Sequence, residues 1–457
     1  MSDPAPPTGP TGTGPAVGGR PGRRALDREI ARLAVPAFAT LVAEPLYVLA
    51  DTAVVGHLGT EQLAGLALAS TVLLTGHAVF IFLAYGTTAA VARLLGAGDE
   101  RRAAHQAVQG LWLAVAIGVA LTALGWWQGD DLIRVLGGEG DVATQAGIYL
   151  RISLLGVPAL LLTLAGTGYL RGLQDTRTPL VVAVVSALAN LVIELVLIFG
   201  LGFGIGASAL STVIAQVGAA AVFATIVARA AARLGVGARP DLRAIAALAK
   251  VGGDLLVRTA ALRFSLTVAT AVTARLGTVP LAAHQIAFEI WSVLALGLDA
   301  IAIAGQAMIG RLLGAGDAAG ARVAGRRMIT WGVVAGVGSG LVVLAASPWL
   351  PRVFSPDPEV VALAGFLLVW VAALQPVNGV VFVLDGVLIG AGDLRFLAVA
   401  MVGAAAVFVP AVVAVGVLGL GVGWVWASLG LLMLTRLVVL GARFAGDRWA
   451  VVGAVRA

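Results

Sequence analysis

The sequence contains no cysteine, and it has few charged residues for its length. Of its 457 residues, 12% are charged and 60% are hydrophobic, with a mean hydropathy of +0.99. The missing cysteines exclude disulfides and thiolate metal sites. Soluble domains carry roughly 25% charged residues, so this composition excludes an ordinary soluble protein and indicates an integral membrane protein.

Motifs for nucleotide hydrolysis and metal-dependent catalysis are also missing. The sequence has no Walker-type GxxxxGK[ST] segment, and its histidines lack a metal-binding spacing such as HExxH. A membrane-embedded transferase or hydrolase would need a His, Asp or Ser constellation at one membrane face, and none is evident. We therefore expect no enzymatic activity, no cofactor and no metal beyond a coupling ion. Energy has to come from an ion gradient or a partner. The scattered histidines are His57, His77, His105 and His284.

Long apolar runs predict the fold class. Each run is long enough to cross a bilayer as a helix, which takes about 20 residues, and none shows the strict alternation of a barrel strand. We predict an all-α membrane protein with twelve transmembrane helices, six in each half. The runs cover about residues 33–55, 63–90, 106–128, 148–170, 179–202, 206–230, 251–275, 281–306, 329–347, 360–390, 396–415 and 420–441.

An internal duplication explains the two sets of six. The heptapeptide RLLGAGD occurs at Arg93–Asp99 and again at Arg311–Asp317, and the same offset aligns DTAVVGHLGTEQLA (51–64) with ATAVTARLGTVPLA (269–282) without gaps. A register shared by several landmarks indicates duplication. We predict two homologous six-helix lobes, parallel repeats related by a pseudo-two-fold axis along the membrane normal, a plan typical of transporters.

The placement of Lys and Arg predicts the orientation in the membrane. Twenty-four of the thirty basic residues fall in the two tails and the even-numbered connections, whereas the odd-numbered connections hold four. The positive-inside rule then predicts a multi-pass cell-membrane protein with both termini in the cytoplasm. Topology accounts for the net charge of +6, so we expect no nucleic-acid partner. We interpret RLLGAGD as a cytoplasmic turn whose Asp99 or Asp317 caps the next helix.

Composition also predicts the boundaries of the lobes. The first residues are rich in Pro, Gly and Thr without an apolar core, which favours a disordered tail over a signal peptide. The longest basic connection is the predicted linker, and one chain supplies both lobes, so we expect a monomer. The predicted segments are a cytoplasmic tail (1–25), an N-lobe (26–228), a cytoplasmic linker (229–250), a C-lobe (251–445) and a second cytoplasmic tail (446–457).

Polar stripes inside the spans of the first half mark a candidate site. Oxygen-bearing side chains recur at helical spacing in three spans, so each set lies on one helical face. Such groups could converge on a proton or a small hard cation. The stripes are Glu44, Tyr47 and Asp51 in the first span, Ser186, Asn190 and Glu194 in the fifth, and Ser208, Thr212 and Gln216 in the sixth.

Two of these acids are the strongest functional candidates. A carboxylate in hydrocarbon is costly, and no Lys or Arg lies in the same spans to pair with Asp51 or Glu194. We interpret the two serines and Gln216 as helix-packing residues and leave the role of Glu44 open. Pro36 is expected to bend the first span.

The second half carries different polar residues. A polar stripe that includes Gln285 and Asp299 runs along the eighth span, and Asp385 lies within the tenth. Together with Tyr47, these three residues are the candidates for a substrate pathway, with helix packing as the alternative for the two acids. Asp254 and Arg258 are spaced i, i+4 in the seventh span, which predicts an internal ion pair.

The segments DTAVVGHLGTEQLAG, RLLGAGD, NLVIE and GIGASALSTVIAQ, in this order, resemble the multidrug and toxic compound extrusion (MATE) transporters, and specifically their DinF-like branch. The resemblance covers roughly residues 26–445. It implies a secondary active exporter that moves organic, often cationic, compounds outward in exchange for inward protons or sodium ions.

The resemblance also implies residue roles. It places Asp51 at the family's first-helix acid and Pro36 at its bending proline. Asn190 and Glu194 fall at a fifth-helix Asn-xxx-Asp pair, and Thr212 at a sixth-helix hydroxyl. Glu194 departs from the family, which commonly has Asp there, and this leaves the identity of the coupling ion open.

We therefore predict an antiporter for small organic compounds that uses protons, with sodium ions as the alternative. Asp51, Asn190, Glu194 and Thr212 are predicted to hold the coupling ion. A lipid-linked saccharide flippase of related architecture is the alternative function. Such a flippase should line its cavity with several Arg or Lys to bind pyrophosphate, whereas only Arg258 and Arg263 lie well inside the predicted spans.

Overall fold

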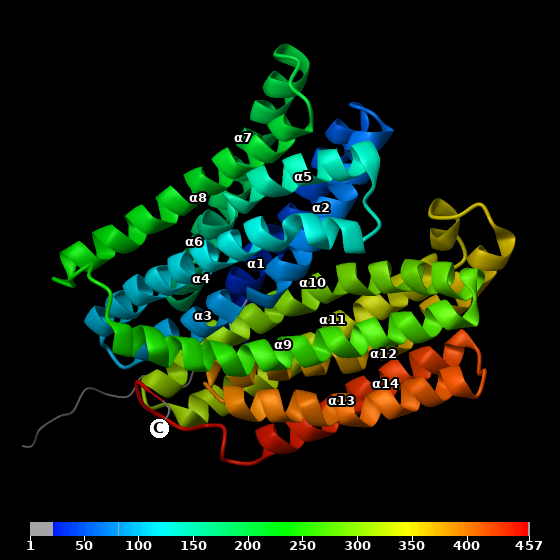
Figure 1. The fold of residues 1–457 in the computed structure, drawn as a ribbon. Coiled ribbons are helices and arrows are strands. Elements are labelled where there is room, and N and C mark those ends of the chain that lie inside the picture. Colours follow the sequence, from blue (N-terminus) through cyan, green and yellow to red (C-terminus); the bar gives the residue numbers. More distant parts are fainter. Residues whose placement is uncertain (1–21, 81, 456–457) are drawn as a thin grey trace, which may run out of the picture.

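The computed structural model describes residues 22–80 and 82–455, and these are almost entirely helical (Figure 1). Within them, ten helices are long and apolar enough to cross a membrane, and a bent pair, α5 with α6, makes an eleventh candidate. The predicted all-helical membrane fold is confirmed. The predicted second span, 63–90, is covered by α2 and α3, and residue 81 between them lies outside the described residues.

The helices form two bundles, which we call the N-lobe (α1–α8) and the C-lobe (α9–α14) (Figure 1). The N-lobe consists of α1 (Arg23–Gly56), α2 (Thr60–Phe80), α3 (Phe82–Gly96), α4 (Glu100–Val135), α5 (Gly140–Leu154), α6 (Val157–Gly172), α7 (Arg177–Leu195), the π-helical turn η1 (Val196–Gly200) and α8 (Ile205–Arg233). The C-lobe consists of α9 (Leu242–Leu276), α10 (Thr278–Gly314), α11 (Ala318–Ala346), the 3-10 turn η2 (Leu350–Val353), α12 (Pro358–Gly390), α13 (Leu394–Val417) and α14 (Val422–Ala445).

The lobes meet at one end of the molecule and diverge toward the other (Figure 1). The C-terminal segment and the connection from α8 to α9 lie where the lobes meet, which we call the closed end. Helix α8 extends to Arg233 and α9 begins at Leu242, so helix occupies both ends of the predicted 229–250 linker. Most of the predicted first tail lies outside the described residues.

The two RLLGAGD copies form the turns that the sequence predicts. The Asp99 carboxylate accepts a hydrogen bond from the backbone N–H three residues on at 2.9 Å, and Asp317 accepts the equivalent bond at 2.6 Å. Gly98 and Gly316 have φ angles of 75° and 82°, in the left-handed region that favours glycine. The capping role predicted for both aspartates is confirmed.

The same two segments also pack against each other across the lobe interface. A methyl group at Gly96, the end of α3, would lie 2.0 Å from the carbonyl oxygen of Arg311 on α10. A methyl group at Gly314, the end of α10, would lie 2.0 Å from the carbonyl oxygen of Arg93 on α3. The glycine of each copy thus lets the backbone of the other copy approach closely. The two copies together close this end of the molecule.

The C-terminal segment fastens the closed end. Arg93 of the N-lobe is buried, and its guanidinium donates to the carbonyl oxygens of Ala391 at 2.8 Å and Val451 at 2.7 Å. The backbone N–H of Gly453 donates to the carbonyl of Leu313 at 2.9 Å. The segment after α14 therefore contacts both lobes.

Ion pairs from the first helix cross the same interface. Asp27 on α1 accepts two hydrogen bonds from Arg327 on α11, at 2.6 and 2.7 Å. Glu29 accepts one from Arg311 at 2.7 Å. These ion pairs are partly exposed, so each stabilises the closed end only modestly. The close packing at Gly96 and Gly314 provides the shape complementarity of the interface.

We predict that Gly314→Ala opens the closed end. The added methyl group has to displace a backbone carbonyl, and overpacking costs about 1–3 kcal/mol, so the ratio of closed to open molecules should fall roughly 5- to 150-fold. The chain has no native cysteine, so spin labels on cysteines at the exposed positions 101 and 326 report the distance between the lobes by pulsed electron paramagnetic resonance.

Gly338→Ala is the matched control, because a methyl group there meets no atom within 4 Å. Its distance distribution should match the parent protein. If Gly314→Ala gave the same distribution as Gly338→Ala, the glycine contact would not control closure.

Candidate functional site

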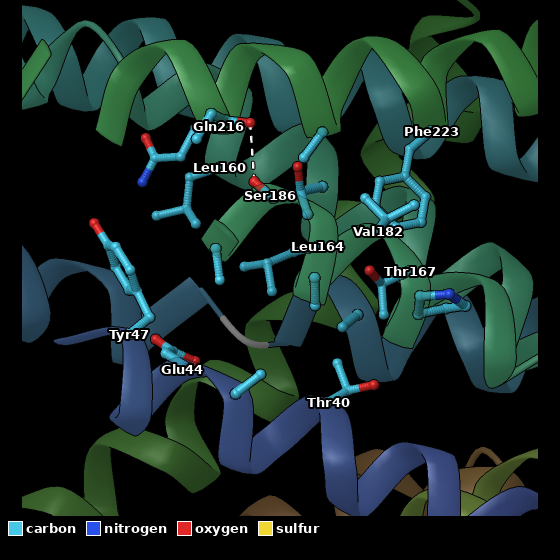
Figure 2. Close-up of a pocket in the computed structure, with 18 of the residues that line it drawn as sticks. Thr40, Glu44, Tyr47, Leu160, Leu164, Thr167, Val182, Ser186, Gln216 and Phe223 are labelled. Carbon is cyan, nitrogen blue, oxygen red and sulfur yellow. Dashed lines mark hydrogen bonds between the residues drawn. The ribbon is translucent and has the colours of Figure 1, made fainter. Parts of the chain in front are cut away.

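A cavity of about 260 Å³ lies within the N-lobe, which we call the N-lobe cavity. Its walls come from α1, α3, α6, α7 and α8. Figure 2 shows Thr40 and Tyr47 on α1 at one side, Gln216 and Phe223 on α8 at the other, and Leu164 of α6 between them. The lining is mostly apolar, with hydroxyl, amide and charged groups at a few positions, as is typical of pockets for organic compounds.

A second cavity of about 290 Å³ adjoins it, and we call this the acid cavity because Asp51 lines it. Tyr47 and Thr212 line both cavities, and their hydroxyl groups are hydrogen-bonded at 2.7 Å. The bond joins the first predicted stripe to the third. It therefore connects the surroundings of the buried acid to the walls of the N-lobe cavity.

Asp51 is held by a buried hydroxyl. Its side chain is buried, and its Oδ1 accepts a hydrogen bond from the hydroxyl of Ser208 on α8 at 2.5 Å. Ser208 is predicted from its sequence to be a helix-packing residue, whereas its hydroxyl in the structure donates to the carboxyl group of Asp51. Periodicity alone could not distinguish the two roles, because both put Ser208 on the inward face of its helix.

Glu194 lies next to this pair and is fully buried on α7. Neither of its carboxyl oxygens has a hydrogen-bond partner among the described residues, although Asp51 and Glu194 lie close enough to interact electrostatically. Asn190, one turn earlier, is also buried without a partner for its amide and lines the N-lobe cavity. Helix α7 continues directly after Glu194 into the π-helical turn η1, a feature found frequently at functional sites.

The arrangement suits a bound cation or proton. Buried polar groups without partners are rare, because each costs free energy. A proton shared between the two carboxyl groups would remove their charge, and a sodium ion would gain carboxylate, amide and hydroxyl oxygens as ligands. No group of three His, Asp or Glu side chains able to hold a metal ion is present in the described part of the chain.

The acid of the tenth predicted span has a different environment. Asp385 on α12 is buried and accepts hydrogen bonds from Arg258 at 2.5 Å and from Arg436. The predicted pair of Asp254 with Arg258 is wrong, because Arg258 turns instead to the buried carboxylate on α12, and Asp254 stays half-buried. Arg436, near the end of the predicted span 420–441, lies buried in α14.

The residues predicted for a substrate pathway separate in space. Asp299 accepts a hydrogen bond at 2.7 Å from the hydroxyl of Tyr85, which joins the two lobes. Gln285 is exposed and donates to Glu289 at 3.0 Å. Of the four predicted pathway residues, only Tyr47 lines either of the two cavities.

Two tyrosines and an arginine at the two cavities were not predicted from the sequence. Tyr149 lines the acid cavity within electrostatic reach of Asp51, and Tyr85 lines the N-lobe cavity. Tyrosine is rare in this chain, with four in all, and that rarity inside apolar spans was a usable signal. Arg171 falls just after the predicted span 148–170, yet it lies buried in the last turn of α6.

Comparison with known proteins divides the chain into the same two halves. The MatE family model matches twice, over residues 36–196 and 255–415. The chain is 30% identical to Protein DETOXIFICATION 43 of Arabidopsis thaliana, covering 93% of this chain and 91% of that protein. It is 28% identical to DNA damage-inducible protein F of Escherichia coli, covering 80% and 81%. The solved structure of the Vibrio cholerae MATE transporter VcmN in the bent form matches with a TM-score of 0.84 at 19% identity, covering 94% and 98%.

We predict that Ser208→Ala destabilises the N-lobe. It leaves a buried carboxyl oxygen without its donor, which costs about 1–3 kcal/mol. Ser211→Ala is the matched control, since Ser211 is also fully buried on α8 but donates only to a carbonyl of its own helix, at 2.8 Å, a bond that contributes little to helix stability. The midpoint of thermal unfolding in detergent should fall more for Ser208→Ala, and equal midpoints would contradict the role given to this hydroxyl.

Proposed function

Because the chain belongs to the MatE family of efflux transporters, we propose that it is a secondary active antiporter that exports organic cations in exchange for protons. The observation that carries this proposal is the buried pair of carboxyl groups, Asp51 and Glu194, beside the N-lobe cavity. Sodium ions are the alternative coupling ion, because the same oxygens suit them. The transporters of this family are not enzymes.

We assign the coupling site to Asp51, Asn190, Glu194 and Thr212. A proton bound between Asp51 and Glu194 lowers the negative charge next to Tyr47 and Thr212, and these two residues line the N-lobe cavity. A ligand shifts a conformational equilibrium only through different affinities for the two states. Substrate and proton, bound at adjoining cavities, can therefore compete through the Tyr47–Thr212 contact.

The cationic substrate is supported by Glu44. This exposed carboxylate lines both the N-lobe cavity and the acid cavity. Figure 2 shows it beside Tyr47, whose hydroxyl is hydrogen-bonded to that of Thr212. A carboxylate at this point attracts a cation before it reaches the apolar walls.

Alternating access follows from the two-lobe arrangement. We assign the closed end to the cytoplasmic side of the cell membrane, because the basic connections gather there, so that the described state opens outward. Pro36 lies in the interior of α1 without interrupting it, and the carbonyl oxygen of Pro36 accepts a hydrogen bond from the hydroxyl of Thr40 at 2.9 Å. One chain supplies both lobes, which supports a monomer that rocks one lobe against the other.

The flippase alternative has less support. Binding of pyrophosphate needs several free cationic groups at one cavity. Arg258 and Arg436 both bind Asp385 and line neither cavity. A single arginine, Arg171, remains at the N-lobe cavity.

We predict that Asp51→Asn abolishes proton-driven export. The substitution preserves shape and removes the group that takes up the proton, so substrate movement no longer depends on proton flow. Efflux of a fluorescent cationic dye is measured in proteoliposomes with proton and sodium gradients imposed separately. Proton-driven movement should be lost in Asp51→Asn and retained in Ser265→Ala, because Ser265 lies on α9, lines neither cavity and donates only to the backbone carbonyl of Ala261 at 2.9 Å.

If a sodium gradient alone drove dye movement by the wild-type protein, the coupling site would stay assigned to the same residues and the coupling ion would be sodium. Proton-driven export by Asp51→Asn at the wild-type rate and equal membrane abundance would refute the assignment of Asp51.

A further inference from the structure

Arg171 is a buried cation without a direct partner in the described part of the chain. It lies in the last turn of α6, is 6% exposed and lines the N-lobe cavity. No hydrogen bond or ion pair joins its guanidinium group to any residue that the structure describes. A buried charge without a close partner is costly, so an anion bound in the cavity would stabilise this group.

The acids nearest to Arg171 are already engaged. Asp299 is close enough to interact with Arg171 electrostatically, but its Oδ2 accepts a hydrogen bond from Tyr85 at 2.7 Å. Asp385 binds two other arginines. Three guanidinium groups therefore share two carboxylates, and the cluster at this part of the lobe interface carries one uncompensated positive charge.

The cavity around Arg171 offers a site for an organic anion. Thr163 lines the cavity, and its hydroxyl is buried without a partner among the described residues. Thr167 lies one turn before Arg171 on α6, and Figure 2 shows Val182 and Phe223 near Thr167. A guanidinium fork matches the two oxygens of a carboxylate, and the apolar walls suit an aromatic body.

We propose that Arg171 forms an anion subsite of the substrate cavity and binds the carboxylate of an amphoteric organic compound. Glu44 lines the same cavity toward the end opposite Thr167 (Figure 2) and faces the compound's cationic group. The proposal rests on the exporter function, since it treats this cavity as the substrate site. It adds a preference for compounds that carry both charges over compounds that carry only the positive charge.

Two dyes that differ only in the carboxylate provide the test. Rhodamine 110 carries a free carboxylate beside its cationic ring system, and rhodamine 123 is its methyl ester. Binding of each dye to purified protein in neutral detergent is followed by fluorescence anisotropy, for wild type, Arg171→Gln and Arg171→Lys. Arg263→Gln is the matched control, because Arg263 is exposed on α9 and lines neither cavity.

Wild type should bind rhodamine 110 more tightly than rhodamine 123. Arg171→Gln should weaken binding of rhodamine 110 roughly 10- to 100-fold, the range of a charged hydrogen bond, and leave rhodamine 123 nearly unchanged. Arg171→Lys should be intermediate, since it keeps the charge and loses the fork. Retained binding of the ester shows that the variants are folded.

Equal weakening of both dyes, unchanged binding of rhodamine 110 by Arg171→Gln, or a wild type without preference for the acid would each overturn the subsite. Transport of rhodamine 123 under a proton gradient tests the exporter function separately. An Arg171-dependent preference for the acid, without gradient-driven transport of the ester, would uphold the subsite and reject the antiporter.

Discussion

The burial of Asp51 and Glu194 against each other is the constraint on which the functional account depends. Two carboxyl groups in an apolar bundle, served by one hydroxyl donor from Ser208, are a costly arrangement unless a cation or proton joins them. The three helices α1, α7 and α8 bring these groups together, and the Tyr47–Thr212 bond lies on the wall that the acid cavity shares with the N-lobe cavity. The other features of the N-lobe position this site or connect it to the lobe interface.

The duplication supplies the two lobes and the contact that joins them. Each RLLGAGD copy ends one helix and caps the next, and its glycine lets the backbone of the other copy approach closely. Close contact through glycine gives a tight but separable interface, because neither lobe has to unfold to leave it. Buried charges gather between the lobes beyond this contact. The Tyr85–Asp299 bond there crosses from one lobe to the other, so polar contacts as well as glycine packing join the lobes.

Sequence periodicity predicted the helices and the polar stripes of the N-lobe, because side chains at helical spacing share one face of a helix. Polar side chains on a buried face are costly, so their presence there indicates a packing or functional role. Asp51, Asn190, Glu194 and Thr212 were found in this way. The same reasoning failed for Arg258, whose true partner lies on a helix distant in sequence, and for Arg171, which looks like an ordinary residue of a connection. Local spacing describes one helix, and contacts between helices require the packing of the whole bundle.

Proton release on substrate binding tests the central claim most directly. If the acids and the substrate compete through adjoining cavities, binding of the non-titrating cation tetraphenylphosphonium in weakly buffered detergent should release about one proton per bound cation, by thermodynamic linkage. A pH-sensitive dye measures the release, which should disappear in Glu194→Gln while the cation still binds. Binding of the cation by wild type without proton release across near-neutral pH would contradict the account.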